Sequence, residues 1–380
     1  MFSFTEEQKL LIQSVTALAK EHLAPKAEEL DETEGFNKTA FQKMAELGLL
    51  GITADEVYGG ANLGALETTL VMEKLAEACA STTLSYLAHS ILCVNNIHAN
   101  GSEAQKQKYL PKLISGEWLG AMAMTEPEAG SDALGLLTKA EKKGNKYIIN
   151  GAKTYITNGP GGDVFVVYAK TGPSRKDVST FIVESRFPGF KVSKKLKKMG
   201  MRGSPTAELA FIDCEVPVEN LIGKENDSIA HMMKNLNLER ITISGISLGI
   251  ATACLNYSTR FAQERHQFGK PIAHFQMIQE RISEMAAQLD AGRALCYSAA
   301  RRFDSGDSDP TLGAKCKLFT AQLGTQAGLD AIQILGGAGY MKEYPVERYM
   351  RDAKLLEIGA GTNEIMRIII AKSLLNLKDK

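Results

Sequence analysis

The segment that most constrains the architecture of this chain runs from residue 232 to residue 250 and reads MMKNLNLERITISGISLGI. The chain stays free of charged residues from Ile241 to Thr259, which is nearly the length that a helix needs to cross a bilayer. This uncharged run also holds many serine and threonine side chains, which do not suit a surface that faces lipid. Gly245 and Gly249 would let a neighbouring helix approach closely. We therefore expect a helix buried in a soluble core, and no membrane span.

One residue interrupts the apolar pattern of this helix. The stripe at helical spacing contains Met232, Leu236, Glu239, Ile243, Ile246 and Ile250. A carboxylate in such a stripe is costly to bury unless it is paired, and burial raises its pKa toward neutrality. A carboxylate with a pKa near 7 is a competent general base, so Glu239 is a candidate catalytic residue. The stripe alone leaves two alternatives open, which are a buried ion pair with an arginine and a carboxylate that reaches water.

The hydrophobic period changes twice along the chain. A period of 3.6 residues marks helices at Thr5–Leu23, Lys38–Leu47, Leu63–Ala80, Leu84–Asn100 and Ser102–Leu113. A period of two residues then marks strands at Lys146–Ile149, Lys153–Thr157, Val164–Ala169, Ser179–Glu184, Phe190–Val192 and Ala207–Cys214. Long helices return at Asp227–Glu264, Phe275–Gly306, Pro310–Leu335 and Glu364–Leu377.

These periods predict the fold class. Short strands at this spacing indicate an antiparallel barrel or sandwich. Helices that exceed the usual globular length indicate an antiparallel bundle. We therefore predict an α+β, multidomain chain. Its parts are an N-terminal α-helical domain (1–119), a middle antiparallel β-barrel or sandwich domain (120–225) and a C-terminal four-helix-bundle domain (226–380).

Composition disfavours several classes of protein. The 380 residues contain 44 Lys+Arg and 44 Asp+Glu, and a zero net charge disfavours a nucleic-acid binder or a polybasic membrane-surface protein. The basic run at 193–198 is interpreted either as a solvated loop or as a local attraction for an anionic ligand. The cysteines form no C-x-x-C pair and the histidines show no metal-ligand spacing, so we expect reduced thiols and no metal site. A P-loop and a Rossmann glycine motif are also absent, which disfavours a nicotinamide enzyme of the usual kind.

Two loop-like segments, Thr125–Asp132 and Ile358–Glu364, are dense in small polar residues. The second leads into a predicted helix start, where free N–H groups bind anions or polar ligands well. For each segment by itself, a plain turn is the favoured interpretation.

Taken together and in order, these segments resemble one family. The matching motifs are Met124–Pro127 with Ala129–Asp132, Ile156–Gly159, Met199–Ser204, Arg265 with Phe268–Gly269 and Phe275–Gln276, Gln333 with Gly336–Gly337 and Gly339–Tyr340, and Arg351–Lys354. The sequence resembles the acyl-CoA dehydrogenases, flavoenzymes that oxidise an acyl-CoA thioester to its α,β-enoyl form. The resemblance spans nearly the whole chain and implies the same α–β–α organisation.

Within the family, the chain most resembles the members that act on isovaleryl-CoA. Most members carry the base at the position of Ala360, whereas isovaleryl-type members carry it on an earlier helix in a Leu-x-Leu-Glu-Arg context. Leu236–Arg240 matches that context, so the resemblance and the apolar stripe both select Glu239. The absence of a bulky residue at Gly359 makes room for a methyl branch, and Leu84 either limits the pocket or packs in the core. The implied reaction converts isovaleryl-CoA to 3-methylcrotonyl-CoA, as in leucine catabolism.

The resemblance also implies a cofactor, its contacts and a partner. FAD would be held by Met124, Thr125, Gly130, Ser131, Tyr155, Ile156, Thr157, Thr362 and Glu364. The FAD of an adjacent subunit would be contacted by Arg265, Gln276, Gln333, Gly336 and Gly337, which implies a homo-oligomer and, by analogy, a tetramer. The acyl-CoA would contact Ser131, Asn237, Arg240 and Gly361. The backbone N–H of Ala360 would donate to the thioester oxygen, Glu239 would take the α-proton, and electrons would leave through electron-transfer flavoprotein.

Some positions depart from the family pattern. Tyr155 stands where most members have a tryptophan beside the flavin. Asn237 replaces an acidic residue, and Ala230 replaces a tyrosine that approaches the CoA arm. These two changes leave open another short acyl thioester, tethered to CoA or to a carrier protein. A non-catalytic flavin-binding homologue is a further alternative, but it would gain nothing from a costly buried Glu239.

The beginning of the chain bears on location. Phe2–Gln8 is acidic and leads directly into a helix, with Thr5 and Gln8 at the spacing of a capping box. This pattern differs from a secretory signal. We therefore expect a bacterial-type cytoplasm, or the mitochondrial matrix if the chain is a mature form.

Overall fold

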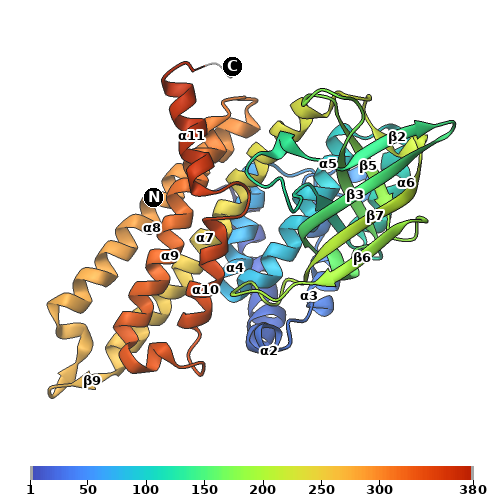
Figure 1. Ribbon diagram of the computed structural model, residues 1–380. Coiled ribbons are helices and arrows are strands. Elements are labelled where there is room, and N and C mark those ends of the chain that lie inside the picture. Colours follow the sequence, from blue (N-terminus) through green and yellow to red (C-terminus); the bar gives the residue numbers. More distant parts are fainter. Residues whose placement is uncertain (1–2, 378–380) are drawn as a thin grey trace.

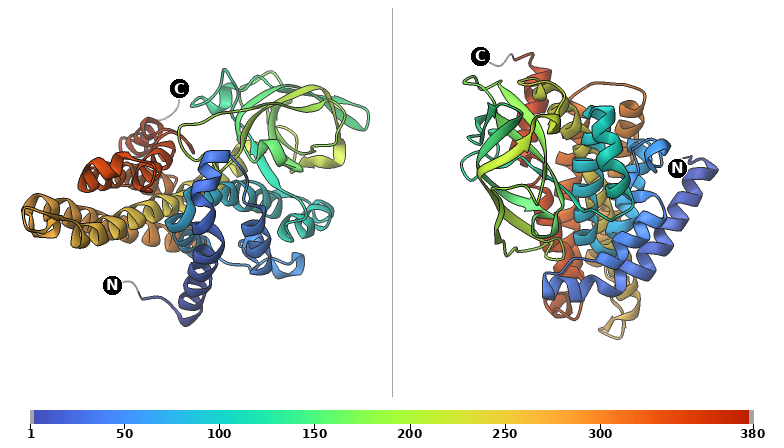
Figure 2. Two further views of the ribbon diagram at one scale, coloured as in Figure 1. Left: turned by 90° about the horizontal axis from the view of Figure 1, so that it is seen from below. Right: turned by 90° about the vertical axis from the view of Figure 1, so that its right-hand side faces the viewer.

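The computed structural model describes residues 3–377, so Phe2 of the predicted N-terminal pattern lies outside the described residues. The order of secondary structure is helical, then β, then helical, which confirms the predicted order. Figure 1 shows the sheet on one side of a group of long helices, and the two further views in Figure 2 show the same separation. The site described below is built from both parts.

The N-terminal part consists of α1 (Glu6–Leu18), α2 (Ala27–Thr33), α3 (Lys38–Glu46), α4 (Ala65–Leu87), α5 (Asn95–Asn100) and α6 (Glu103–Ile114). The capping box before α1 is present, because the Thr5 side chain accepts from Gln8 N and the Gln8 side chain accepts from Thr5 N. The predicted break between residues 80 and 84 is wrong. The chain stays helical there and continues through a π-helical segment, Ala88–Val94, into α5. The irregularity lies at Cys79 instead, whose φ of −157° and ψ of 100° kink α4.

The middle part is one eight-stranded sheet with the strand order β6-β7-β3-β2-β4-β5-β8, and β1 pairs with β4. Its strands are β1 (Gly120–Ala123), β2 (Lys139–Lys143), β3 (Lys146–Thr157), β4 (Val164–Lys170), β5 (Val178–Glu184), β6 (Phe190–Lys195), β7 (Thr206–Pro217) and β8 (Leu221–Ile222). Most pairings are antiparallel, as predicted, but β1 and the first residue of β2, Lys139, each pair in parallel with β4. The two strands predicted between residues 146 and 157 are halves of the single strand β3, which has register shifts opposite β7.

The sheet curves over itself, because aromatic rings meet across strands that are not neighbours. Phe165 of β4 contacts Phe190 of β6 with ring centroids 4.8 Å apart, and Tyr147 of β3 contacts Phe181 of β5 at 4.9 Å. The alternate side chains of β4, including Val166, face a second core that is shared with α5, α6 and the start of α7. The sheet therefore has one apolar face enclosed by its own strands and another covered by helices.

Strand β6 contains half of the basic run that was interpreted as a loop. Residues 193–195 belong to this exposed edge strand, where lysines discourage pairing with another sheet. Two lysines of the run are not free in solvent. Lys195 Nζ donates to Glu34 O, and Lys198 Nζ donates to Ser204 O, both at 2.8 Å.

The C-terminal part contains α7 (Ser228–Glu264), α8 (Gln276–Asp304), α9 (Thr311–Leu335), α10 (Val346–Leu356) and α11 (Asn363–Leu374). A short hairpin of β9 (His266–Gln267) and β10 (Lys270–Pro271) joins α7 to α8. The four predicted long helices are present within a few residues of their expected ends, but α10 was not predicted. Its sequence, VERYMRDAKLL, is rich in charged residues and forms only three turns.

Helix α7 is the central element of the C-terminal part and packs against α4, α8, α9 and α10. Gly245 and Gly249 lie where α4 crosses closely, since a Cβ at these positions would lie 2.5 Å from Thr69 O and 2.4 Å from Glu73 O. Among the described residues, α7 is the one helix whose length and composition would suit a membrane span. Its most apolar window is 94% buried inside the protein, which agrees with the expected core helix.

Candidate active site

The carboxylate of Glu239 is buried in the first half of α7 and is only 5% exposed. Within residues 3–377 its Oε2 atom has no hydrogen-bond partner, and the carboxylate forms no ion pair. Burial raises the pKa of Glu239 to about 7, while the nearby charges of Arg240 and Lys317 act in the opposite direction. Neither alternative left open by the sequence, an ion-paired or a solvent-exposed carboxylate, describes this group.

A loop between α10 and α11 lies against the same part of α7. The Nε of Arg240 donates to the main-chain oxygen of Ala360 at 3.1 Å. Ala360 has a φ of +56° and Gly361 a φ of +90°, so the loop reverses direction through two left-handed residues. A Cβ at Gly361 would lie 2.9 Å from Met366 Cε and would displace the end of that side chain.

The N–H of Ala360 is a free donor. In the described part of the chain it donates to no backbone or side-chain acceptor, whereas Gly359 N in the same loop donates to Leu355 O at 2.8 Å. The hydrogen bond from Arg240 therefore joins the segment that carries this unpartnered N–H to the turn of α7 that carries the unpartnered carboxylate of Glu239. A donor of this kind can stabilise an oxygen on which negative charge develops.

The predicted cofactor residues after this loop begin α11. Thr362 is the N-cap of α11, and its Oγ1 accepts from Ile365 N at 3.3 Å. Glu364 is exposed and forms an ion pair with Arg367 at 3.0 Å. The sequence was therefore right to expect a helix start here, and its N–H groups point toward the Ala360 loop.

The predicted cofactor loop before β2 is anchored by a buried ion pair. Glu126 Oε1 and Lys153 Nζ lie 2.8 Å apart, and both side chains are almost completely inaccessible to solvent. Lys153 Nζ also donates to Met124 O at 3.0 Å, and Thr154 N donates to Thr125 O at 2.9 Å. The end of β3 and the Met124–Thr125 segment are thus held side by side.

Sequence reasoning missed both members of this pair as site-forming residues. Burial lowers the pKa of Lys153 to about 8, although Glu126 opposes this shift. Burial also acts to raise the pKa of Glu126, but Lys153 and the N–H groups of Leu137 and Thr138 outweigh it and lower that pKa. The available signal was a lysine at a buried position of a strand, which requires a partner.

Beside this anchor, Tyr155 projects into solvent. It has a φ of +59° and is 71% exposed, whereas Ile156 is buried and Thr157 half-buried. Gly130 and Ser131 are exposed, and a Cβ at Gly130 would meet nothing within 4 Å. Of the predicted flavin residues of the middle part, Gly130, Ser131 and Tyr155 are therefore the exposed ones, and the ion pair supports the strand end and loop that carry them.

Two predicted substrate residues are held by the protein itself. Asn237 Oδ1 accepts from Gly313 N at 3.1 Å, and its Nδ2 donates to Asp309 O at 3.3 Å, so the side chain binds the start of α9. Leu84 is buried within α4 and belongs to the main hydrophobic core. The core-packing alternative therefore describes the surroundings of Leu84.

The residues predicted to serve an adjacent subunit lie elsewhere. Arg265 follows α7, Gln276 begins α8, and Gln333, Gly336 and Gly337 end α9, and all five are exposed. Helices α7 and α9 run in the same direction, and α8, which lies between them in the sequence, runs in the opposite direction. These residues therefore gather at one end of the bundle. The rise of an α-helix places Arg265 roughly 39 Å along α7 from Glu239. They therefore cannot reach the Glu239 site of their own chain.

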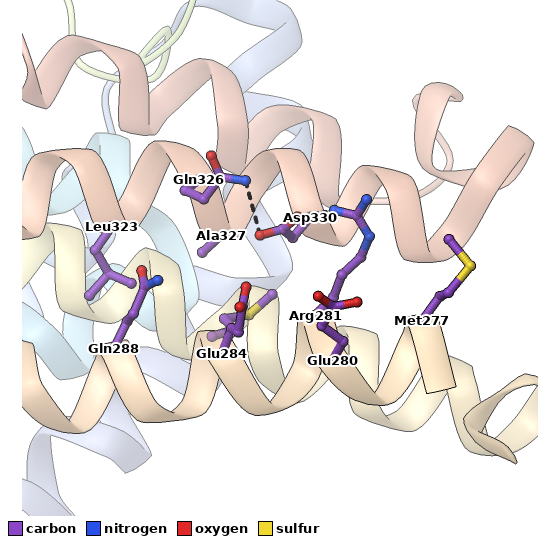
Figure 3. A pocket seen from close by; sticks show the side chains of 10 residues that line it. Met277, Glu280, Arg281, Glu284, Gln288, Leu323, Gln326, Ala327 and Asp330 are labelled. Carbon is purple, nitrogen blue, oxygen red and sulfur yellow. Dashed lines mark hydrogen bonds and ion pairs between the residues drawn. The ribbon is translucent and has the colours of Figure 1, made fainter. Parts of the chain in front are cut away.

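Figure 3 shows a groove of about 470 Å³ between α8 and α9. It is lined by Met277, Glu280, Arg281, Glu284, Met285, Gln288, Leu323, Gln326, Ala327 and Asp330. Arg281 and Asp330 form an ion pair in its lining, and the dashed line in Figure 3 marks the hydrogen bond that Gln326 donates to Asp330. None of the residues predicted for catalysis, cofactor or substrate lines this groove, so it is separate from the candidate site.

Comparison with known proteins supplies the remaining evidence. Sequence models of the acyl-CoA dehydrogenase N-terminal, middle and C-terminal domains match residues 5–117, 121–214 and 227–375. The mitochondrial isovaleryl-CoA dehydrogenase of Pongo abelii is 48% identical over 375 residues, which cover 97% of this chain and 89% of the relative.

Two solved structures show the same architecture. Butyryl-CoA dehydrogenase from Megasphaera elsdenii superposes with a TM-score of 0.96 at 36% identity, covering 99% of this chain and 100% of that one. The prolyl acyl carrier protein oxidase AnaB superposes with a TM-score of 0.94 at 34% identity, covering 98% of this chain and 100% of the other.

Proposed function

The chain belongs to the acyl-CoA dehydrogenase family of flavin-dependent oxidoreductases, and on this premise we propose that it oxidises isovaleryl-CoA to 3-methylcrotonyl-CoA. The identity of 48% to a mitochondrial isovaleryl-CoA dehydrogenase supports this substrate. Gly359 supports it as well, because this position carries no side chain that would exclude a methyl branch. The atoms nearest to a Cβ there would belong to Leu355, at 3.6 Å or more, which is ordinary van der Waals contact.

A single pair of groups carries the proposal, namely the carboxylate of Glu239 and the N–H of Ala360. Both are unpartnered among the described residues, and the Arg240–Ala360 hydrogen bond holds their segments together. A buried carboxylate without a partner is costly to maintain, so its presence favours a chemical role over a purely structural one.

The two groups suit the removal of a proton next to a thioester. The Cα–H of a thioester is weakly acidic, and a carboxylate can remove it only if the developing enolate oxygen is stabilised. The Ala360 N–H would donate to that oxygen, and the Glu239 carboxylate would take the proton. When bound, FAD supplies the acceptor for the hydride that leaves the β-carbon.

The residues present fit an FAD molecule. Gly130, Ser131 and Tyr155 are exposed, and Tyr155 supplies an aromatic face on which a flat ring can stack. Met124, Thr125, Ile156, Thr157, Thr362 and Glu364 would complete the contacts within one chain. Arg265, Gln276, Gln333, Gly336 and Gly337 would serve the FAD of a second copy, since they lie too far from Glu239 of their own chain.

The assembly and partners follow from the same family membership. We propose a homotetramer, with electron-transfer flavoprotein as the acceptor of electrons and leucine breakdown as the pathway. The cytoplasm, or the mitochondrial matrix for a mature chain, would be the location. Size-exclusion chromatography with light scattering tests the oligomer, because a stable monomer with bound FAD would contradict sharing of the cofactor.

The decisive experiment is anaerobic bleaching of the protein's flavin by isovaleryl-CoA. We expect isovaleryl-CoA to bleach the flavin of the wild-type protein. Glu239→Gln should keep its flavin but bleach at a rate at least 10³-fold lower, because the amide cannot take the proton. Glu284→Gln, the same change on the exposed surface of α8, serves as the control and should bleach normally. Unchanged bleaching in Glu239→Gln would remove Glu239 from the role of base.

A second candidate substrate is an acyl thioester on a carrier protein. Two observations favour it, which are the structural match to a prolyl acyl carrier protein oxidase and the engagement of Asn237 with α9. A panel of isovaleryl-, butyryl- and 2-methylbutyryl-CoA, with the same acyl groups on a carrier protein, separates the two. Bleaching by carrier-bound substrates alone would replace the first proposal by the second.

A further inference from the structure

Lys317 is a buried lysine that the proposed reaction does not use. Its side chain in α9 is only 1% exposed, and its Nζ donates to Asn363 Oδ1 at 3.1 Å. An ammonium group has three donors, and this is the one acceptor that it contacts among residues 3–377. Burial lowers the pKa of Lys317 to about 8, so the group still carries its charge at neutral pH. Such a residue needs an explanation, because an exposed lysine would be far less costly.

The packing of α9 against α7 directs Lys317 toward the candidate site. Gly313 and Lys317 are four residues apart in α9 and therefore share a face of the helix. A Cβ at Gly313 would lie 2.6 Å from Asn237 O and 2.7 Å from Arg240 Cβ, so this face is in direct contact with α7. Lys317 thus enters the protein beside the turn of α7 that carries Glu239 and Arg240.

The acceptor of Lys317 belongs to the loop that carries the free N–H. Asn363 is the first residue of α11 and follows Ala360 by three positions, and it is buried. Its backbone N–H donates to Glu357 O at 2.9 Å, which closes the loop. Lys317 and Arg240 therefore hold the two ends of the same short segment, one at Asn363 and the other at Ala360.

The titratable groups around Glu239 come from three elements. The charged groups are Arg240 on α7 and Lys317 on α9, and the neutral, buried hydroxyl of Tyr168 lies on β4. Besides burial, the charge of Arg240 lowers the pKa of Lys317, whereas the carboxylates of Glu239, Glu357 and Glu364 raise it. With Glu239 ionised, the three buried charged groups Glu239, Arg240 and Lys317 sum to one positive charge. That excess favours an ionised carboxylate and a negatively charged thioester enolate.

We propose that Lys317 is a positioning residue of the thioester site, which holds the Ala360 loop through Asn363 and provides a second positive charge, beside that of Arg240, that favours the ionised form of Glu239. This inference rests on the proposed function for its chemical meaning. Its physical content concerns only the loop and the carboxylate of Glu239. A structural role alone would require the bond to Asn363 but would leave the titration of Glu239 unchanged.

The sign of the expected effect follows from the charge. Glu239 takes a proton only when it is ionised, and a nearby cation favours the ionised form. Removal of the cation therefore raises the pKa of Glu239 and moves the acidic limb of the pH–rate profile to higher pH. For the removal of one nearby unit charge, we expect a shift of about one pH unit.

The test compares three variants at one pair of neighbouring lysines. Lys317→Gln removes the charge but can still donate to Asn363, Lys317→Arg keeps the charge, and Lys315→Gln removes a charge from the partly exposed neighbour. Infrared difference spectroscopy follows the protonated carboxyl band of Glu239, which Glu239→Gln identifies by its disappearance. The same variants give the pH profile of kcat/KM with isovaleryl-CoA.

We expect the midpoint of the Glu239 band to rise by about one unit in Lys317→Gln and to stay at the wild-type value in Lys317→Arg and Lys315→Gln. Asn363→Ala keeps the charge and should lower kcat by about tenfold without moving the midpoint, because it releases the loop alone. A wild-type midpoint in Lys317→Gln would overturn the proposal. If Lys317→Gln does not fold, a changed midpoint in Lys317→Arg would overturn it.

The infrared titration needs neither substrate nor turnover, so it separates the two proposals. A wild-type protein that does not bleach with any acyl thioester, but whose Glu239 band responds to Lys317, would reject the proposed function and retain the electrostatic relationship. Normal bleaching together with a Glu239 band that does not respond to Lys317 would retain the proposed function and reject the electrostatic relationship.

Discussion

The Nε of Arg240 donates to the main-chain oxygen of Ala360 at 3.1 Å, although the two residues are 120 positions apart in the chain. Arg240 is adjacent to Glu239, and the N–H of Ala360 is the free donor of the site. This hydrogen bond therefore links the helix that carries the carboxylate directly to the loop that carries the donor. Charge-assisted hydrogen bonds of this kind are about twice as strong as neutral ones.

Ala360 contributes a backbone group in a conformation that disfavours its side chain. Its φ of +56° lies in the left-handed region, which costs a non-glycine residue roughly 1–2 kcal/mol. Ala360→Gly should therefore raise the free energy of unfolding by about 1 kcal/mol and keep kcat within about twofold, since the N–H remains. Urea unfolding and steady-state kinetics measure both. Ala371→Gly on the exposed face of α11 is the matched control and should lower stability by about 1 kcal/mol.

Glu239 makes the stability of the protein depend on pH. Its pKa is about 7 in the folded protein against an ordinary value of 4.5, so between these values the folded state holds a proton that the unfolded state releases. The free energy of unfolding therefore falls as pH rises from about 4.5 to about 7, by roughly 3 kcal/mol from this group. Glu239→Gln should lose this slope.

Urea unfolding at pH 5, 6, 7 and 8, with equal flavin loading, measures the slope. The free energy of unfolding of Glu239→Gln, relative to that of the wild type, should increase as the pH rises. The control Glu284→Gln, an exposed position, should follow the wild type throughout. A difference that is constant with pH would contradict the raised pKa.

The ion pair between Glu126 and Lys153 should be far more sensitive to the loss of one partner than to the loss of both. Lys153→Met leaves the buried Glu126 carboxylate with only backbone N–H partners, which we expect to cost about 3–5 kcal/mol. The double variant Glu126→Gln/Lys153→Met removes the unpaired charge and should recover much of that loss. Urea unfolding of the wild type and the variants gives the free energies for a double-mutant cycle, and gel filtration shows whether FAD is released. Equal losses in the single and double variants would argue against the pair as the anchor.

The loop after β6 packs against α10, and Gly200 lies in close contact with the backbone of that helix. A Cβ at Gly200 would lie 2.2 Å from Arg351 O, and Met201 N donates to the buried carboxylate of Asp352. Gly200→Ala should lower the free energy of unfolding by about 1–3 kcal/mol, because the backbone of α10 cannot yield easily.

Thermal unfolding measures that loss, and Gly161→Ala is the control. A Cβ at Gly161 would meet only Leu119 Cδ2, at 3.8 Å, so this variant should match the wild type. Wild-type stability in Gly200→Ala would show that the loop can move away from α10. The outcome bears on the site, because α10 leads directly into the Ala360 loop.

Local patterns were sufficient for most elements of the fold. The 3.6-residue and two-residue periods predicted the helical, β and helical order, and the capping box at Thr5 located the start of α1 within one residue. The errors occurred where tertiary packing overrides local preference. Strand β1, with the sequence GAMA, has weak strand propensity and forms because it pairs with β4 and is almost fully buried. The charged sequence of α10 likewise forms a helix because the loop at Gly200 and the long helices hold it.

The sequence by itself determined that Glu239 would be a carboxylate in an apolar stripe, because helical periodicity is a local property of the chain. It could not determine that this carboxylate would have no partner, that Ala360 would offer a free N–H, or that Lys317 would approach from α9. Those facts depend on which side chains meet from segments far apart in the sequence. Only the tertiary structure brings Arg240, Ala360, Lys317 and Asn363 together, and burial in that shared environment is what raises the pKa of Glu239 toward 7.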